Sequence, residues 1–404
     1  MQCRSAGWAA VCVCVCVLLV TPPGQSVEDV EGNHANSSEQ VRQSQSLGAA
    51  EQKYIHRRKQ KVLESLSGLG INLTADSVPH IALLGSGGGQ RAAVALLGSL
   101  YQMEEDGLLD SLLYIGGVSG STWSMSSLYS DPSWRENISR VISTMSGPNL
   151  GWIPSMEWLT DMKANDQDFS LTDPWAAFIA DHFIKEIDTR QLSGDCDRNA
   201  TNPYPVYNAI EKTCNTENTT EGKWFEVTPH ESGFTDLGLF IKTSHLGSIF
   251  QAGELLEERP EMDMVKLQGV YTKAAILPLV NSWEWGTTKN FLYQYNDSSV
   301  PSCLQSENFY LIDAGLYNNV PYPPFLGERR DIDLIIALEY SAGNMFETLT
   351  LARDYAAEVN KPFPKIDDEV LEDKDWPKDC YVLQGEQNEP TIVYMPLFNR
   401  INCK

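Results

Sequence analysis

The chain reads Tyr114-Ile-Gly-Gly-Val-Ser-Gly-Ser-Thr-Trp123. The apolar run Leu112 to Ile115 predicts a short buried strand, and the glycines on both sides of Ser119 predict a very tight turn, because glycine tolerates strained backbone. Such a turn lifts one hydroxyl out of a sheet and places it at a helix N-terminus, where the dipole favours negative charge. Ser119 is therefore a candidate nucleophile, although glycine-serine clusters also occur in ordinary turns.

A second glycine loop precedes this turn. The loop Gly85 to Arg91 follows the apolar run His80 to Leu84 and leads into a helical pattern from Ala92 to Glu105. The order strand, glycine loop, helix, strand, serine turn, helix predicts a parallel sheet covered by helices, with chemistry at the carboxyl ends of the strands. We therefore predict an α/β fold of three layers, with a mostly parallel central sheet flanked by helices.

The remainder divides into an irregular middle and a return of the strand pattern. Residues 130–304 are rich in Trp and Pro and have few clean periods, so we interpret them as inserted cap elements. After them, the pattern predicts strands at 309–312, 332–339 and 391–394 and a helix at 346–359. The first of these strands leads directly into Asp313.

The first 26 residues form a unit of their own. Arg4 precedes an apolar run from Trp8 to Val20, and turn-forming residues follow, which predicts a secretory signal peptide; the cysteines within the run leave palmitoylation as an alternative. Residues 27–51 are polar and are expected to be a flexible linker. The folded domain is then expected to span residues 52–404.

Cysteines and glycosylation sequons bear on the compartment. Of the five cysteines beyond residue 26, Cys196 and Cys214 bracket a polar loop and can pair if the compartment is oxidising. Six N-x-S/T sequons begin at Asn36, Asn72, Asn137, Asn199, Asn218 and Asn296, and they are acceptors only in the secretory pathway. Together with the leader, these features predict a glycoprotein of the secretory pathway or extracellular space.

The chain is strongly acidic, with 30 Lys and Arg against 54 Asp and Glu and a formal net charge of −24. A nucleic-acid-binding protein carries a basic face, so nucleic acid is excluded as a partner. General adhesion to anionic lipid is disfavoured for the same reason.

The loop at 85–91 has three interpretations. It lacks the Gly-Lys-Ser/Thr ending of a phosphate-binding P-loop. Gly87, Gly89 and Ala92 fit a dinucleotide fingerprint, but the next strand does not end in the expected acidic residue. Consecutive glycines also direct backbone N–H groups to one point, as an oxyanion hole for acyl transfer requires. The nearby serine turn favours this third interpretation.

A nucleophilic serine needs a base. All six histidines precede Asp313, so the order serine, acid, histidine cannot be completed with this aspartate. The remaining arrangement is a dyad of Ser119 and Asp313. A carboxylate is a weak base in water, with a pKa of about 4. Burial would raise that pKa and make the carboxylate a better acceptor of the serine proton. The alternative role of Asp313 is that of a turn residue before Gly315.

Three motifs together carry a family resemblance: residues 85–92, residues 117–123 and Asp313-Ala-Gly-Leu. They resemble the catalytic domain of the group IV cytosolic phospholipase A2 family, from about residue 52 to the end, and the likeness is nearest to members without a calcium-binding C2 domain. The resemblance implies a patatin-like α/β fold and hydrolysis of fatty-acyl esters of glycerophospholipids, with transfer to a lysolipid as a second outcome. It implies a phospholipid membrane or aggregate as partner, and neither metal, calcium nor other cofactor.

The resemblance also implies roles for particular residues. Ser119 would be the nucleophile, Asp313 the base, and Gly88 and Gly89 the oxyanion donors. Two arginines would bind the substrate phosphate, whose oxygens match the planar guanidinium donors: Arg91 and Arg330.

Three departures from the family leave alternatives open. Only residues 270–281 occupy the place of a long lid insertion, the C-terminus is short, and the family is mostly cytosolic. A catalytically inactive lipid-binding protein and a cytosolic, peripheral membrane location therefore remain as alternatives. The glycine fingerprint of Gly87, Gly89 and Ala92 leaves a dinucleotide-binding oxidoreductase as a further alternative.

Overall fold

The structure is a computed structural model of the 404-residue chain that describes residues 40–165, 168–195, 200–216, 223–272 and 285–402. The expected signal peptide, most of the expected lid segment, Cys196 and the sequons at Asn36, Asn199 and Asn218 lie outside the described residues.

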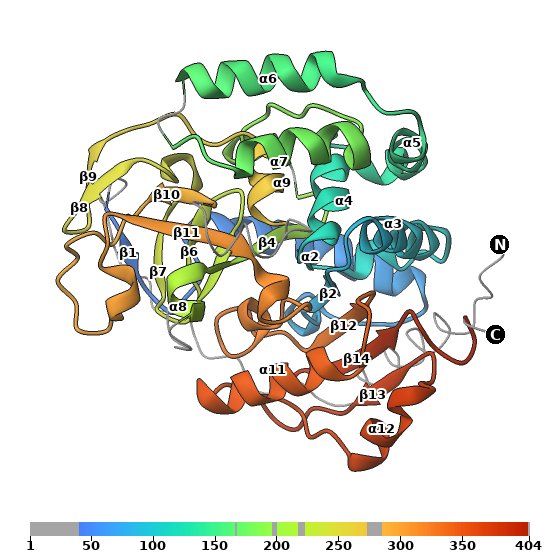
Figure 1. Ribbon diagram of the computed structural model, residues 1–404. Helices are drawn as coiled ribbons and strands as arrows, with labels where there is room; N and C mark the ends of the chain where they lie inside the picture. The colour runs from blue at the N-terminus through green and yellow to red at the C-terminus, as the bar shows by residue number, and fades with distance from the viewer. Residues whose placement is uncertain (1–39, 166–167, 196–199, 217–222, 273–284, 403–404) are drawn as a thin grey trace.

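Parallel strands form the centre of a large sheet (Figure 1). Their order is β4-β3-β2-β12-β14, with these bounds: β2 Ile81–Gly85, β3 Tyr114–Gly117, β4 Tyr204–Glu211, β12 Leu334–Glu339 and β14 Thr391–Pro396. Every residue of β2, β3, β4 and β12 is buried. Continuous apolar runs are typical of strands that are covered on both faces, so the predicted α/β fold with a central sheet is confirmed.

Antiparallel strands extend this centre at both edges. Beyond β4 lie β5 (Trp224–Val227), β6 (Glu231–Phe234), β7 (Leu239–Lys242) and β1 (Arg42–Gln43), and β13 (Tyr381–Leu383) borders β14. The sheet also takes in β10 (Thr287–Lys289) and β11 (Asn308–Asp313), whereas β8 (Ile249–Gln251) and β9 (Glu254–Glu257) form a separate hairpin. The expected cap over residues 130–304 is therefore wrong for strands β4, β5, β6 and β7, which belong to the large sheet.

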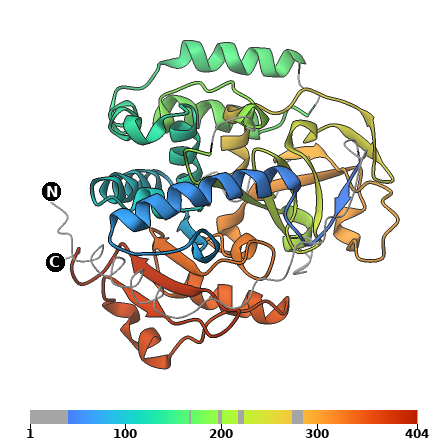
Figure 2. The same ribbon diagram turned by 180° about the vertical axis from the view of Figure 1, so that it is seen from behind.

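Helices lie on both sides of the sheet. In Figure 1, α3 to α7 are seen above the strands and α11 and α12 below, and Figure 2 shows α2 running across the opposite side. The bounds are α2 Ala49–Gly68, α3 Gln90–Glu105, α4 Gly120–Tyr129, α5 Trp134–Ser146, α6 Trp152–Asn165, α7 Thr172–Ile179, α8 Lys212–Thr216, α9 Met264–Val270, α11 Glu347–Glu358 and α12 Asp368–Glu372. A π-helical turn continues α7 over Ala180–Ile184, and short 3₁₀ turns include η6 (Ser302–Leu304) and η7 (Ala314–Leu316).

The spacing of apolar residues explains how α3 packs. Its buried residues recur three or four positions apart, so they share one face: Ala92, Ala93, Leu96, Leu97, Leu100 and Met103. Helix α4 is different, because every one of its residues is buried. It is short and rich in serine, so neighbouring backbone can approach it closely.

The N-terminal part of the described chain is more ordered than a linker. Strand β1 pairs with β7, and α2 begins at Ala49. Glu51 in the first turn of α2 is only 1% exposed. The expectation of a flexible linker is therefore wrong for residues 42–51. None of the helices in the described ranges has the length and hydropathy needed to cross a membrane.

Candidate active site

Strands β3 and β11 approach each other along one edge of β4. Residues 204–207 of β4 pair with β3, while residues 209–211 pair with β11, and β5 occupies the opposite edge. Because β3 is parallel to β4 and β11 is antiparallel, the C-terminal ends of β3 and β11 point toward one another. Ser119 follows the end of β3, and Asp313 is the last residue of β11. The sheet topology alone therefore brings these two residues together.

The two side chains are in direct contact. Ser119 Oγ donates a hydrogen bond of 2.9 Å to Oδ2 of Asp313, although 194 residues separate them in the sequence. The other carboxylate oxygen of Asp313 accepts from the N–H of Gly315 at 2.8 Å. Ser119 is 6% exposed and Asp313 is 3% exposed. One carboxylate oxygen is thus held by the backbone while the other faces the hydroxyl.

The backbone at Ser119 is strained. Its φ of 51° lies in the left-handed region, which non-glycine residues rarely adopt, and it is the N-cap residue of α4. Strain of this kind amounts to about 1–3 kcal/mol and gathers at functional sites. The turn places Ser119 beyond the end of β3, where it lines the pocket and contacts Asp313.

Serine hydroxyls hold α4 against the glycine loop. Ser121 Oγ donates to the carbonyl oxygen of Ser86, and Ser124 Oγ donates to that of Ala93, both at 2.6 Å. The small side chains permit this close approach and satisfy buried carbonyl groups. The turn at Ser119 and the loop at 85–91 therefore form one packed unit.

Gly88 and Gly89 lie beside Ser119 in the same pocket. Their φ angles are 144° and 61°, so both use conformations that glycine adopts without steric cost. Gly89 is the N-cap residue of α3, where backbone N–H groups are not paired within the helix. The location fits donors aimed at a negative oxygen near Ser119.

The pocket has a volume of about 330 Å³ and one aromatic wall. Trp123, Trp175 and Phe183 contribute to the lining, and Trp123 stacks on Phe183 with 5.1 Å between ring centroids. The other lining residues are Gly88, Gly89, Gln90, Ser119, Thr272, Asp313, Gly315 and Asn319. No histidine is among the described residues that line the pocket. Ser119 and Asp313 therefore contact each other directly, opposite the aromatic wall, with no imidazole between the two side chains.

Arg91 lies at the rim of the glycine loop. Its Nε donates to the carbonyl oxygen of Tyr340 at 2.7 Å, and its guanidinium lies 5.1 Å from the ring centroid of Phe398. The residue is exposed, and a methyl group added to Gly88 would lie 3.3 Å from its Nη2. Arg91 therefore presents guanidinium N–H groups to solvent next to the pocket.

Comparison with known proteins finds similar chains in one family of lipid hydrolases. The family described as "Lysophospholipase catalytic domain" matches residues 81–277. Human cytosolic phospholipase A2 gamma is 29% identical over 88% of this chain and 86% of its own, and the mouse protein is 27% identical over 88% and 83%. The solved structure of human GIVD cytosolic phospholipase A2 matches with a TM-score of 0.77 at 25% identity, covering 88% of this chain.

In sequence and in fold, the chain is similar to the group IV cytosolic phospholipase A2 family. The resemblance drawn from the three motifs is thereby confirmed, and the dinucleotide-binding alternative gains no support. The chain covers 56% of the length of the GIVD chain.

Within this group IV phospholipase fold, Arg330 lies away from the pocket. Its Nε donates to Glu51 at 2.9 Å, its Nη2 donates to Glu226 at 2.8 Å, and its Nη1 donates to the carbonyl oxygen of Pro324. The side chain is fully buried, and these anions offset the desolvation of its charge. The structure therefore does not bring the predicted phosphate ligand Arg330 to the site.

Some residues that line the pocket belong to no recognisable motif in the sequence. The backbone carbonyl oxygen of Asn319 accepts a hydrogen bond of 2.8 Å from the N–H of Gly87. Thr272 Oγ1 accepts a hydrogen bond of 2.8 Å from Trp123 Nε1. Asn319 lies six positions after Asp313 in the sequence. That short spacing is the one signal that can place it near the dyad.

Proposed function

We propose that this chain is a phospholipase A2 or lysophospholipase that hydrolyses fatty-acyl esters of glycerophospholipids through Ser119 and Asp313. The observation that carries this proposal is the hydrogen bond of 2.9 Å from Ser119 Oγ to Asp313 Oδ2. Its position beside two glycines and an aromatic wall supports acyl transfer in particular. Similarity to a phospholipase family supports a phospholipid substrate.

In the first step, Asp313 accepts the Ser119 proton while Oγ attacks the ester carbonyl carbon. Negative charge moves to the carbonyl oxygen, where the backbone N–H groups at Gly88 and Gly89 stabilise it. As the intermediate collapses, the protonated Asp313 returns the proton to the leaving alcohol of the lysolipid. The products of this step are an acyl-enzyme on Ser119 and a free lysolipid.

In the second step, water attacks the acyl-enzyme, and Asp313 again acts as base. The fatty acid is released and Ser119 is regenerated. If a lysolipid hydroxyl takes the place of water, the acyl group is transferred instead. Each step uses only the dyad and backbone donors, so we expect activity to persist when calcium is chelated.

The pocket suggests how the substrate lies. The wall of Trp123, Trp175 and Phe183 fits a fatty-acyl chain, because it offers apolar area next to the nucleophile. The exposed guanidinium of Arg91 fits the substrate phosphate, whose oxygens match its donor geometry. The reacting ester would then lie between the two, above Ser119.

A fluorophosphonate probe tests the dyad, because it reacts covalently with activated serine. Human GIVD cytosolic phospholipase A2 has been solved in complex with methyl gamma-linolenyl fluorophosphonate, which supports the choice of probe. We expect Ser119→Ala to abolish both labelling and phospholipid hydrolysis. Asp313→Asn is expected to lower the labelling rate and kcat by about 10²–10⁴-fold, because it removes the general base.

The matched control is Ser143→Ala, which changes an exposed serine on α5 and should label like the parent. Labelling that persists in Ser119→Ala would contradict the assignment of the nucleophile. Lipid binding without labelling of the parent chain would favour the inactive lipid-binding alternative.

We also propose that the chain enters the secretory pathway and is glycosylated. A disulfide joins Cys214 to Cys303, and disulfides persist mainly in oxidising compartments. The sequons at Asn72 and Asn296 are exposed and therefore accessible. We expect the protein expressed in animal cells to gain electrophoretic mobility after endoglycosidase treatment. An unchanged mobility would favour the cytosolic location.

A further inference from the structure

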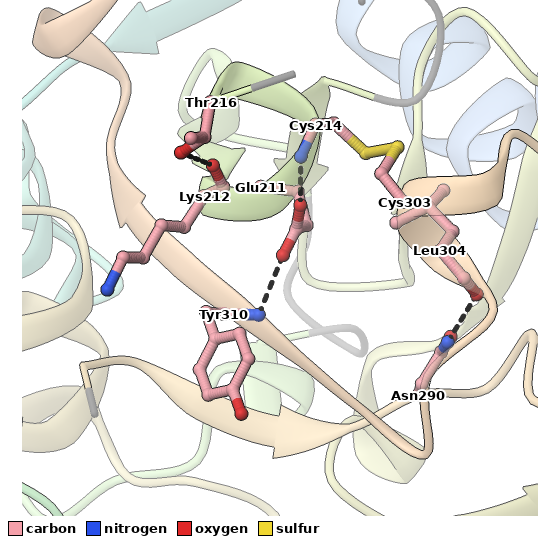
Figure 3. The surroundings of a disulfide bond; sticks show 8 residues. All are labelled: Glu211, Lys212, Cys214, Thr216, Asn290, Cys303, Leu304 and Tyr310. Carbon is pink, nitrogen blue, oxygen red and sulfur yellow. Dashed lines mark hydrogen bonds between the residues drawn. A yellow bond between two sulfur atoms is a disulfide. The ribbon is translucent and has the colours of Figure 1, made fainter. Parts of the chain in front are cut away.

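A disulfide joins the segments that flank β4 and β11 (Figure 3). Cys214 lies in α8, which follows β4 without a break, and Cys303 lies in η6, shortly before β11. The two cysteines are 89 residues apart in the sequence. The sequence allows Cys214 to pair with Cys196 in an oxidising compartment, but the structure joins Cys214 to Cys303 instead. The cross-link thus joins the end of β4 to the segment just before β11, the strand that ends in Asp313.

Glu211 makes a second link at the same place. It is the last residue of β4 and fully buried. Its Oε2 accepts from the N–H of Cys214 at 2.7 Å, and its Oε1 accepts from the N–H of Tyr310 at 3.1 Å (Figure 3). One carboxylate therefore bonds to the backbone of α8 and to that of β11. The two oxygens of the Glu211 carboxylate therefore accept from two different backbone donors, one in each element.

The segment that carries Cys303 is also anchored to the chain next to β10. Asn290 is buried, and its side-chain amide donates to the carbonyl oxygen of Leu304 at 2.6 Å (Figure 3). Leu304 is itself buried. The disulfide therefore connects α8 to a fixed turn rather than to a free loop.

The disulfide and the Glu211 hydrogen bonds lie at one end of the short pairing between β11 and β4, and Asp313 lies at the other end. In that pairing, Leu311 is opposite Glu211, Ile312 is opposite Ile210 and Asp313 is opposite Ala209. A slip of one residue would turn the Asp313 side chain to the other face of the sheet, because side chains alternate along a strand. The position of Asp313 beside Ser119 therefore depends on this register.

We propose that Glu211 and the Cys214–Cys303 disulfide form a clamp that fixes the register of β11 on β4 and so positions Asp313 against Ser119. The clamp does not touch the substrate and acts through Asp313. The kinetic part of this inference rests on the proposed function. Opening it takes two electrons and two protons, which dithiothreitol supplies as it becomes a cyclic disulfide, and leaves two thiols on the protein.

The first experiment compares the oxidised full-length chain with the same chain reduced by dithiothreitol, with the thiol count checked by mass spectrometry. We expect reduction to lower kcat and the fluorophosphonate labelling rate at least tenfold, while KM changes less than twofold and far-UV circular dichroism is unchanged. A general loss of structure would instead lower labelling and the circular dichroism signal together.

Cysteine variants separate this disulfide from other effects of the reductant. Cys214→Ser with Cys303→Ser should have the lowered kcat without reductant and should not respond to it. Cys380→Ser, which changes a cysteine outside the clamp, should keep the full kcat and the same sensitivity to reduction. Glu211→Gln should also lower kcat with little change in KM, because one acceptor oxygen becomes an amide that faces a backbone N–H.

Hydrogen exchange tests the clamp without reference to catalysis. We expect amides of residues 310–313 to exchange at least tenfold faster after reduction, while those of β14 keep their rates. If reduction is complete and kcat, labelling and exchange are all unchanged, the clamp is refuted. If the oxidised parent neither labels nor hydrolyses lipid, the proposed function fails, and the exchange rates still decide the clamp.

Discussion

Gly120 shows how closely the two halves of the candidate site are packed. A methyl group built on it would lie 1.9 Å from the carbonyl oxygen of Gly89. That atom belongs to the backbone, so it cannot turn aside as a flexible side chain can. The absence of a side chain at position 120 is what lets the turn at Ser119 and the glycine loop face one pocket.

We therefore expect Gly120→Ala to separate the nucleophile from the oxyanion donors. A displacement near 1 Å can lower the rate by about 10²-fold, and overpacking destabilises a core by about 1–3 kcal/mol. The matched control is Gly98→Ala on the exposed face of α3, where no atom lies within 4 Å of the added methyl group. It should keep full kcat and gain up to about 1 kcal/mol of stability. Equal kcat values for the two variants in lipid hydrolysis assays would contradict this account.

At the scale of elements, the sequence predicts the centre of the sheet because its signals are local. Apolar runs, the two glycine loops and the helix between them fall within about forty residues, and their order indicates parallel strands. The dyad is also predictable, because no histidine follows Asp313 and the three motifs resemble one family. The contact between Ser119 and Asp313 follows once β3 and β11 share an edge of β4.

The antiparallel extension carries weaker signals. Strands β5, β6 and β7 have four residues each, and polar residues such as Glu226 and Ser232 are buried within them. Such short segments lack a clear period, so the sequence favours an irregular insertion. Contacts between distant residues are hidden as well: Arg330 is 279 positions from Glu51, and Cys214 is 89 positions from Cys303. Motif position alone cannot separate a substrate ligand from a buried ion pair.

At the scale of the whole molecule, a buried ion cluster joins α2 to the sheet. Arg330 binds Glu51 of α2 and Glu226 of β5, and Arg329 lies 3.1 Å from Glu226. Burial alone would raise the pKa of Glu226, but Arg329 and Arg330 outweigh it and lower this pKa to about 2. Because the cluster connects α2 to the middle of the chain, its protonation state affects the stability of the entire domain.

The sign of the pH dependence follows from that lowered pKa. Glu226 titrates near 4.5 when unfolded and near 2 when folded, so its contribution to stability is complete above pH 4.5 and is lost as the pH falls toward 2. The loss should reach about 2 kcal/mol by pH 3. In urea unfolding between pH 6 and pH 3, the stability gap between the parent and Glu226→Gln should therefore narrow by that amount. As a control, Asp354→Asn alters an exposed ion pair with Arg353, and its difference in stability from the parent should stay nearly constant over the same pH range. A constant gap for Glu226→Gln as well would mean that the cluster does not hold this carboxylate ionised.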